Sequence, residues 1–222
     1  GFSHLWVSDH FFLRPDEPNT DCLEAWTLLS ALGQVTTRIR LGTLVTSQSY
    51  RYPALLAKMA AAVDVMSGGR LEFGVGTGWK EVEYKAYGIP FPPASVRVGQ
   101  LVDTLEIVRA MWTQERATYH GRYYSVEDAV CAPKPLQRPH PPITIAGAGE
   151  KRLLPIVARH ADAWSSFGSP EVFRRKIDVL LTYCEAEGRD CDAIEKQVLV
   201  PAAITEDFST VAPLIQGYAL YQ

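Results

Sequence analysis

The sequence predicts an α/β protein whose parallel strands and helices form a TIM-type (β/α)8 barrel, and two observations predict it. First, residues 39–79 hold a β-branched strand, an amphipathic helix and a second strand. So short a unit can pair its strands only in parallel, with the helix as a right-handed crossover. Second, strands and helices keep alternating up to residue 204, apart from an insertion after residue 79. In a chain of 222 residues, such repeated units favour a barrel over an open sheet.

The first half of the chain is expected to hold strands at residues 5–10, at 39–46 and from 70 onward. The first helix is expected from a cap at Asp21 to residue 37. The second should begin at Pro53, which suits a first helical position, and end at the Gly68-Gly69 pair, which allows a left-handed stop. The residues expected to face inward are Leu23, Trp26, Leu29, Leu32 and Val35 on the first helix, and Leu55, Leu56, Met59, Val63 and Met66 on the second.

The insertion is expected to contain a helix of four turns that Ser95 caps. Its apolar stripe consists of Val98, Leu101, Val102, Leu105, Val108 and Trp112. A turn at 119–124 should join two short strands, and the Pro-rich stretch 131–142 should have little regular structure.

The last part of the chain returns to alternating strands and helices. Strands are expected at 142–147, 161–166 and 198–204. One helix should open within 147–152, and another should be capped by Ser169, with Val172, Phe173, Ile177, Leu180 and Leu181 facing inward. Without a linker or an internal repeat, residues 1–222 are expected to form one domain. Because the chain opens without methionine and enters a strand at once, a first strand-helix unit and the C-terminal end of the barrel are expected to be missing.

Composition limits the possible partners. The net charge is −3, without runs of like charge, so no basic surface is expected for nucleic acid or an anionic membrane. No apolar stretch approaches the roughly 20 residues that cross a bilayer, and no secretory signal is visible, so a cytoplasmic protein is expected. The four cysteines lack Cys-x-x-Cys spacing and are interpreted as reduced packing residues, and no metal site is expected among the five scattered histidines.

Polar residues at the expected strand ends are the candidates for chemistry. His10 ends the first strand beside Asp9, where an imidazole can give or accept a proton near neutral pH; alternatively, a backbone carbonyl satisfies it. Thr43 and Thr46 precede a polar strand exit that includes Tyr50, and their hydroxyls could bind the edge of a ligand ring or satisfy the turning chain.

Two glycine-rich segments also follow expected strands. Gly76, Thr77 and Gly78 would let a flat ligand lie against bare backbone, although their spacing is not the dinucleotide fingerprint and a tight turn explains them equally well. Gly147-Ala148-Gly149 precedes an expected helix, and Lys151 and Arg152 add positive charge. Free amides at a helix start bind phosphate, and a plain strand-to-helix turn is the alternative.

Together these segments resemble the bacterial luciferase-like monooxygenase superfamily. The motifs that carry the resemblance are Trp6 to His10, Leu41-Gly42-Thr43 through Tyr52-Pro53, Asp64 to Leu71, Gly74 to Trp79, Pro142 to Gly147 and Ala161 to Trp164. Within this superfamily, residues 79–89 are most similar to the branch that uses the deazaflavin coenzyme F-420.

The resemblance implies a luciferase-like barrel with an isoalloxazine-type ring in its mouth. The family's strand bulge, commonly with a non-prolyl cis peptide, would map near Leu44-Val45 and support the back of the ring. His10 would be the strand-end histidine near the reactive ring atom, and Gly147, Ala148, Gly149 and the following Glu150 would form the phosphate loop. Asp9, Thr43, Thr46 and residues 76–78 would complete the cofactor site, with Trp79 and Tyr50 in the substrate pocket.

These implications predict an oxidoreductase that transfers hydride between F-420 and a small organic substrate, and a homodimer is expected. One alternative is an FMN-dependent monooxygenase that uses O2. A second is a non-catalytic flavin-binding protein on a shortened barrel. Some deazaflavin dehydrogenases have a proton-donating glutamate directly after their Gly-Thr-Gly, and Trp79 stands there in this chain. Their sugar or alcohol oxidation is therefore not carried over.

Overall fold

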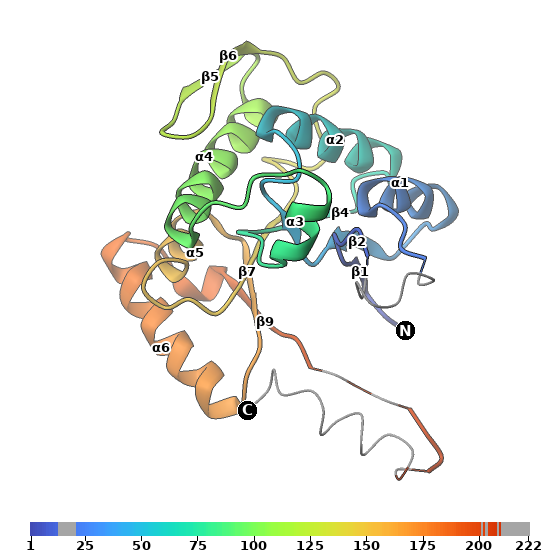
Figure 1. Ribbon diagram of the computed structural model, residues 1–222, viewed down its shortest axis with the longest axis vertical. Helices are drawn as coiled ribbons and strands as arrows, with labels where there is room; N and C mark the ends of the chain where they lie inside the picture. Colours follow the sequence, from blue (N-terminus) through green and yellow to red (C-terminus); the bar gives the residue numbers. More distant parts are fainter. Residues whose placement is uncertain (13–20, 201, 203, 208, 210–222) are drawn as a thin grey trace. The chain divides into compact units, whose positions relative to one another are not determined.

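The computed structural model describes residues 1–12, 21–200, 202, 204–207 and 209 (Figure 1). It divides into two compact units, Gly1–Ile145 and Ala146–Gln222. Each unit is described here by itself.

Unit 1 is built on parallel strands. β1 (His4–Val7) pairs with β2 (Arg40–Thr43), β2 pairs with β4 (Leu71–Gly76), and β4 pairs with β7 (Ile143–Ala146) and with the short β3 (Thr46–Ser47). Every one of these pairings is parallel. The predicted crossover unit is therefore confirmed, but its first strand is divided into β2 and β3 by a break at Leu44-Val45.

Helices and a hairpin complete unit 1. The helices are α1 (Ala25–Val35), α2 (Pro53–Met66), α3 (Glu81–Ala86) and α4 (Ala94–Thr113). α2 packs against both α1 and α4 (Figure 1). The antiparallel hairpin of β5 (Ala117–His120) and β6 (Ser125–Ala129) confirms the predicted turn between two short strands. Trp26, Phe73 and Trp112 lie in contact in the core, with ring centroids 6.1 Å and 5.1 Å apart.

Unit 2 contains α5 (Leu154–His160), β8 (Ala163–Ser166), α6 (Pro170–Ala186), a short 3-10 helix (Cys191–Ala193) and β9 (Glu195–Val198). β8 and β9 pair in parallel, and α5 packs against α6. The predicted cap of α6 is confirmed, because the Ser169 hydroxyl accepts a hydrogen bond from the amide of Val172. Trp164 and Phe173 stack with their centroids 5.0 Å apart.

The Ser67-Gly68-Gly69-Arg70-Leu71 segment joins α2 to β4. Gly68 and Gly69 both have positive φ, which confirms the predicted left-handed stop. Arg70 donates hydrogen bonds to the carbonyl oxygens of Gly33, Thr36 and Ile39, to the Thr36 hydroxyl and to the carbonyl of Ser67. This guanidinium therefore fixes the C-terminal end of α1 to the start of β4.

Several predicted caps and boundaries are wrong. Glu24, and not Asp21, caps α1, because its carboxylate accepts hydrogen bonds from the amides of Trp26 and Thr27. Ser95 lies inside the first turn of α4, which begins after Pro93 and runs for 20 residues, longer than four turns. The last strand ends at Val198, where the predicted strand begins; residues 201 and 203 of that prediction lie outside the described residues.

Some apolar residues predicted to face inward are exposed: Leu23, Val35, Leu55, Met66 and Leu181. Leu23 precedes the observed start of α1, and Val35 ends it. On α2 the buried face consists mainly of small residues, Ala57, Ala60 and Ala61, which let neighbouring helices approach closely. A periodicity that counts only large apolar side chains misses such a face.

Candidate active site

The register of the strands brings three segments to one edge of unit 1. Val7 at the end of β1 pairs with Thr43 at the end of β2, and Ser47 at the end of β3 pairs with Gly76 at the end of β4. Residues 8–12, 44–51 and 77–83 follow these ends. In parallel α/β proteins this carboxyl edge is where ligands bind.

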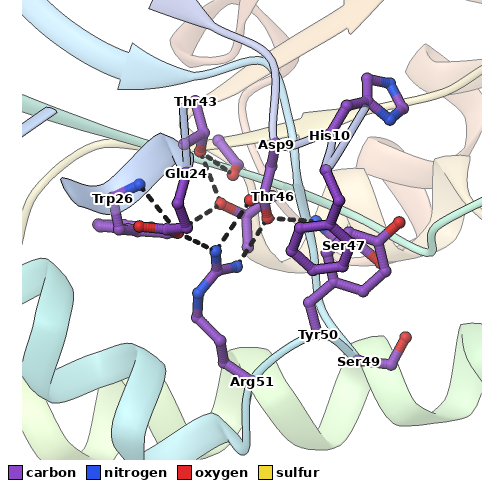
Figure 2. A network of polar contacts seen from close by, with 12 residues as sticks. Asp9, His10, Glu24, Trp26, Thr43, Thr46, Ser47, Ser49, Tyr50 and Arg51 are labelled. Carbon is purple, nitrogen blue, oxygen red and sulfur yellow. Dashed lines mark hydrogen bonds and ion pairs between the residues drawn. The ribbon is translucent and has the colours of Figure 1, made fainter. Parts of the chain in front are cut away.

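A buried ion-pair network lies at this edge (Figure 2). Both carboxylate oxygens of Asp9 accept from Arg51, at 2.8 Å and 2.9 Å, and the amide of Ser47 donates to one of them at 3.3 Å. Arg51 also pairs with Glu24, the cap of α1. Asp9 is thus engaged inside the protein, and its charge joins the end of β1 to the loop that follows β3. The network includes no contact with His10, whose ring points away from the Asp9 carboxylate in Figure 2.

Thr43 and Thr46 are fully buried. The indole Nε1 of Trp26 donates to the Thr46 hydroxyl at 3.1 Å, Thr46 donates to Thr43 at 2.8 Å, and Thr43 donates to the Gly74 carbonyl at 2.7 Å. Of the two alternatives for these hydroxyls, binding a ligand ring or bonding within the protein, this arrangement favours the second. The hydroxyls form hydrogen bonds within the protein where the chain turns.

The peptide bond between Leu44 and Val45 is cis, at the position that the family resemblance implies. Both residues are partly exposed, whereas their neighbours Thr43 and Thr46 are buried. Gly74 of β4 lies beside this segment, and a Cβ there would come within 1.8 Å of the Thr43 carbonyl oxygen. A glycine at position 74 therefore permits the close approach of β2 and β4.

His10 is paired with a carboxylate that is distant in the sequence. Its Nδ1 lies 2.8 Å from Oε2 of Glu83, which is on α3. The His10 side chain is 25% exposed, and the Glu83 side chain is fully buried. The partner of Nδ1 is therefore the carboxylate of Glu83 and not a backbone carbonyl.

Glu83 is surrounded by hydrogen-bond donors. Its Oε1 accepts from the amides of Phe11 and Phe12, at 2.9 Å and 3.2 Å, and from Nζ of Lys80 at 3.2 Å. Its Oε2 also accepts from the Tyr50 hydroxyl at 2.7 Å. Burial opposes ionisation of Glu83, but the hydrogen bonds from His10 and Tyr50 outweigh it and lower the pKa of the carboxyl group.

Aromatic rings surround this pair. The Trp79 ring, 72% exposed, meets the His10 ring edge to face, with centroids 5.7 Å apart and an angle of 82°. Phe11 stacks between Tyr50 and Tyr87, at 4.5 Å and 4.0 Å. Burial and the hydrogen bond to Glu83 raise the pKa of Tyr50 far above its ordinary range, so its hydroxyl remains a donor. Trp79 therefore presents an open ring, whereas the Tyr50 hydroxyl is occupied.

Gly76, Thr77 and Gly78 follow β4 at the same edge. The Gly76 carbonyl accepts from the Gln48 amide at 3.1 Å. Gly78 has a φ of +74°, and a Cβ there would lie 1.9 Å from the Tyr84 hydroxyl, which also hydrogen-bonds to Ser49 at 2.8 Å. Gly78 is thus required by the packing of Tyr84 beneath the turn.

In unit 2, the segment 147–150 connects β7 to α5. The Gly147 amide donates to the Ser165 carbonyl at 3.0 Å, and the Gly147 carbonyl accepts from the Trp164 indole at 3.0 Å. Gly147 is therefore engaged with β8. Within the part of unit 2 that the structure describes, the backbone amides of Ala148, Gly149 and Glu150 have no protein acceptor. The Glu150 carboxylate accepts from Arg175 at 2.7 Å.

The predicted helix opening at 147–152 is wrong by several residues. α5 begins at Leu154, and the amides of Leu153 and Leu154 donate to the Gly149 carbonyl. Pro155 accounts for the difference, because it is tolerated in the first turn of a helix and not further along. The dipole of a full helix therefore does not start at Gly149.

The residues of this site that sequence reasoning missed are Glu24, Arg51, Lys80, Glu83 and Tyr84. Their contacts to Asp9, His10 and Gly78 join parts of the chain that are far apart in the sequence. One local feature could have pointed to Glu83. It is a charged residue on a short helix that directly follows the glycine-rich end of a strand. Among the described residues, no cluster of His, Cys, Asp and Glu is arranged to hold a metal ion, and no helix there has the length and apolarity that crossing a membrane requires.

Comparison with known proteins identifies the family. Residues 1–215 match the family model described as luciferase-like monooxygenase. The chain belongs to the luciferase-like monooxygenase family. The resemblance inferred from the sequence motifs is thereby confirmed.

Relatives within the luciferase-like family include an uncharacterized protein of Mycobacterium tuberculosis strain H37Rv, 36% identical over 79% of this chain and 61% of its own length. An "F420-dependent glucose-6-phosphate dehydrogenase" of Microbacterium testaceum is 32% identical over 95% of this chain and 62% of its own length. The chain thus spans about three fifths of the length of these curated relatives.

Among solved structures, an "F420-dependent secondary alcohol dehydrogenase in complex with an F420-acetone adduct" superposes with a TM-score of 0.87. The match covers 99% of this chain and 66% of that one, at 24% sequence identity. At this identity the likeness shows the fold alone. The predicted fold class, a luciferase-like TIM-type barrel of which this chain holds a part, is confirmed.

Proposed function

We propose that this chain belongs to an oxidoreductase that transfers hydride between the deazaflavin coenzyme F-420 and a small organic substrate. The observation that carries the proposal is the pairing of His10, in the segment that follows β1, with the buried Glu83, beside the open ring of Trp79. Relatives named as F420-dependent dehydrogenases, at 32% and 34% identity, support the choice of coenzyme.

The residues at the edge of unit 1 fit a flat ring. The partly exposed Leu44-Val45 segment offers an apolar surface, and residues 76–78 offer backbone without bulky side chains. When bound, the coenzyme would supply hydride chemistry, while the protein orients the reactants and excludes water. His10 would give or accept the substrate proton. We propose that Asp9 contributes indirectly, by fixing the end of β1 through Arg51.

The segment 147–150 of unit 2 fits a phosphate. The amides of Ala148, Gly149 and Glu150 are available as donors, as described above. Ser166, at the end of β8, supplies a buried hydroxyl without a partner among the described residues. The hydrogen bond from Gly147 to Ser165 holds these two strand ends side by side. A phosphate there would satisfy donors that the protein leaves open.

FMN is the second candidate cofactor, because the family is described as monooxygenases and FMN carries a similar ring and a phosphate. The deciding experiment is a pair of fluorescence titrations of the purified protein with F-420 and with FMN. We expect tighter binding of F-420. Tighter binding of FMN by tenfold, about 1.4 kcal/mol, would contradict the deazaflavin assignment. Binding without turnover of any substrate would favour a non-catalytic flavin-binding protein.

The substrate proposed here is a small organic molecule that contacts Trp79 and the aromatic cluster of Phe11, Tyr50 and Tyr87. We do not extend the glucose-6-phosphate specificity of the named relatives to this chain, because the family resemblance implies a proton-donating glutamate at this position in some deazaflavin dehydrogenases, and Trp79 stands there in this chain. We also propose a homodimer. Light scattering of the full chain tests it, and a mass of 24.6 kDa in solution would contradict it.

A further inference from the structure

We propose that Glu83 is a positioning residue that fixes the tautomer of His10, with the proton on Nδ1 and the lone pair on Nε2. The proton-accepting nitrogen would then be Nε2, the one that Glu83 does not hold. The catalytic consequence rests on the proposed function, but the tautomer itself does not.

The donors around Glu83 carry this inference. Oε1 accepts from the backbone amides of Phe11 and Phe12, which can only donate, and from the Lys80 ammonium, which also can only donate. Oε2 accepts from the Tyr50 hydroxyl and lies 2.8 Å from Nδ1 of His10. A fully buried carboxyl group with so many donors stays ionised, as its lowered pKa indicates.

An ionised carboxylate has no proton to give. Nδ1 of His10 must therefore be the donor in this contact. A neutral imidazole carries only one N–H, so Nε2 is left as an acceptor. The same carboxylate holds the backbone of the next two residues through the Phe11 and Phe12 amides, so it fixes the position of His10 as well as its tautomer.

Glu83→Gln is the sharpest test, because it is isosteric and replaces one acceptor oxygen with an NH2 donor. At the Oε1 position this NH2 would face two amides and an ammonium, none of which can accept. At the Oε2 position it would face Tyr50 and His10, both of which can reverse their roles. The glutamine should therefore direct its NH2 to His10 and force the proton from Nδ1 to Nε2.

The measurement is 15N NMR of the full chain labelled at histidine, without any ligand. The His10 signals are assigned by their loss in His10→Gln. We expect the Nδ1–H tautomer in the parent and the Nε2–H tautomer in Glu83→Gln. An Nε2–H tautomer in the parent overturns the proposal, even if Glu83→Gln does not fold.

Two further variants control for general effects. Asp103→Asn makes the same chemical change at another buried carboxylate, which holds the amides of Tyr123 and Tyr124 in the hairpin, so it should leave the His10 tautomer unchanged. Tyr50→Phe removes one donor and keeps the carboxylate, so Nδ1–H should persist. A switch of tautomer in either control would show that the tautomer does not depend on Glu83.

Turnover separates this proposal from the proposed function. On any substrate that the parent converts with F-420, Glu83→Gln should lower kcat by about 10²–10⁴ with little change in F-420 affinity, because the wrong tautomer faces the substrate. Parent-like kcat in the variant with a switched tautomer overturns the catalytic part. If the parent does not bind F-420, the proposed function fails, whereas the tautomer result on the free protein stands.

Discussion

Glu83 contacts one ring nitrogen of His10, and the His10 side chain is 25% exposed. The neighbouring Asp9 is buried in an ion pair with Arg51. Two adjacent residues just beyond β1 thus have different surroundings. Asp9 joins secondary-structure elements, and His10 presents a group that can exchange a proton at the edge of the sheet. The proposed chemistry therefore depends on a single imidazole and on the contacts that orient it.

Replacing His10 with alanine should lower kcat by about 10²–10⁴, the usual effect of removing a general acid or base. Affinity for F-420 should change far less, because the variant keeps the backbone and Glu83. The measurement is steady-state turnover on a proven substrate, with the exposed His120→Ala as the matched control. Parent-like turnover between about pH 5 and 9 would identify His10 as a packing residue.

Gly149→Val should weaken F-420 binding by about 1–3 kcal/mol, the scale of an unmade hydrogen bond, because the added side chain obstructs approach to the amides of 148–150. The fold should survive, since a Cβ at Gly149 would only reach ordinary contact with Leu153, at 3.6 Å. A deazaflavin with the same ring and ribityl chain but no phosphate serves as the control ligand. If both ligands lose affinity equally, or neither does, the segment does not bind phosphate.

Among the secondary-structure elements, α1 shows most clearly how tertiary contacts set boundaries. Its start is fixed by Glu24, which both caps the helix and pairs with Arg51. Its end is fixed by Arg70, which donates to carbonyls near the C-terminus of the helix. Such carbonyls have no partner within a helix and need an external donor. Both ends of α1 are thus held by arginines from other segments.

Arg70→Lys keeps the charge but removes the planar fork of donors, and a lysine can satisfy only part of the set. We expect the free energy of unfolding to fall by about 2–4 kcal/mol, the range for losing several bonds of a partly buried network. Urea denaturation measures it. Arg116→Lys, in an exposed pair with Asp128, is the control and should cost less than about 1 kcal/mol. Equal losses in the two variants would argue against the proposed role of Arg70.

At the scale of the whole molecule, each compact unit carries candidate ligand-binding groups of its own. Unit 1 presents His10, Trp79 and the cis peptide at its strand ends, and unit 2 presents the amides of 148–150. Buried carboxylates hold several of these segments in place in unit 1. The free energy of unfolding should therefore depend on pH through the buried carboxyl groups Glu83 and Asp9.

The lowered pKa of Glu83 means that its contribution to stability is fully present above the ordinary glutamate value of about 4.3 and is lost as pH falls through the lower folded value. Asp9 acts in the opposite sense, because burial raises its pKa in spite of Arg51. The test therefore compares the free energy of unfolding of the parent and of Glu83→Gln at pH 6 and at pH 3. Between these two pH values, the parent should lose more of it than the variant. Parallel curves would show that Glu83 is not stabilised by its donors.

Local chemistry was sufficient to predict many of the elements. Pro53 and the Gly68-Gly69 pair delimit α2, Ser169 caps α6, and the apolar strands alternate with helices as expected. Each of these signals involves residues that are close in the sequence and therefore also close in space, so the sequence alone is enough to recognise it. The same reasoning placed residues 76–78 at a strand end and His10 close to one, and the parallel register brings the ends of these strands to one edge.

The sequence by itself determined the family and the parallel α/β architecture, whereas the predicted strand at 5–10 ends at Val7, so that His10 lies in the segment after β1. Only the tertiary structure decided which groups satisfy one another. Glu83 is 73 residues from His10, and Arg51 is 42 residues from Asp9. A buried charge must find a partner wherever the fold brings one, because its desolvation is costly and no local rule fixes that partner's place in the sequence. For this reason the buried Asp9 is paired with Arg51, and the buried Glu83 is paired with His10.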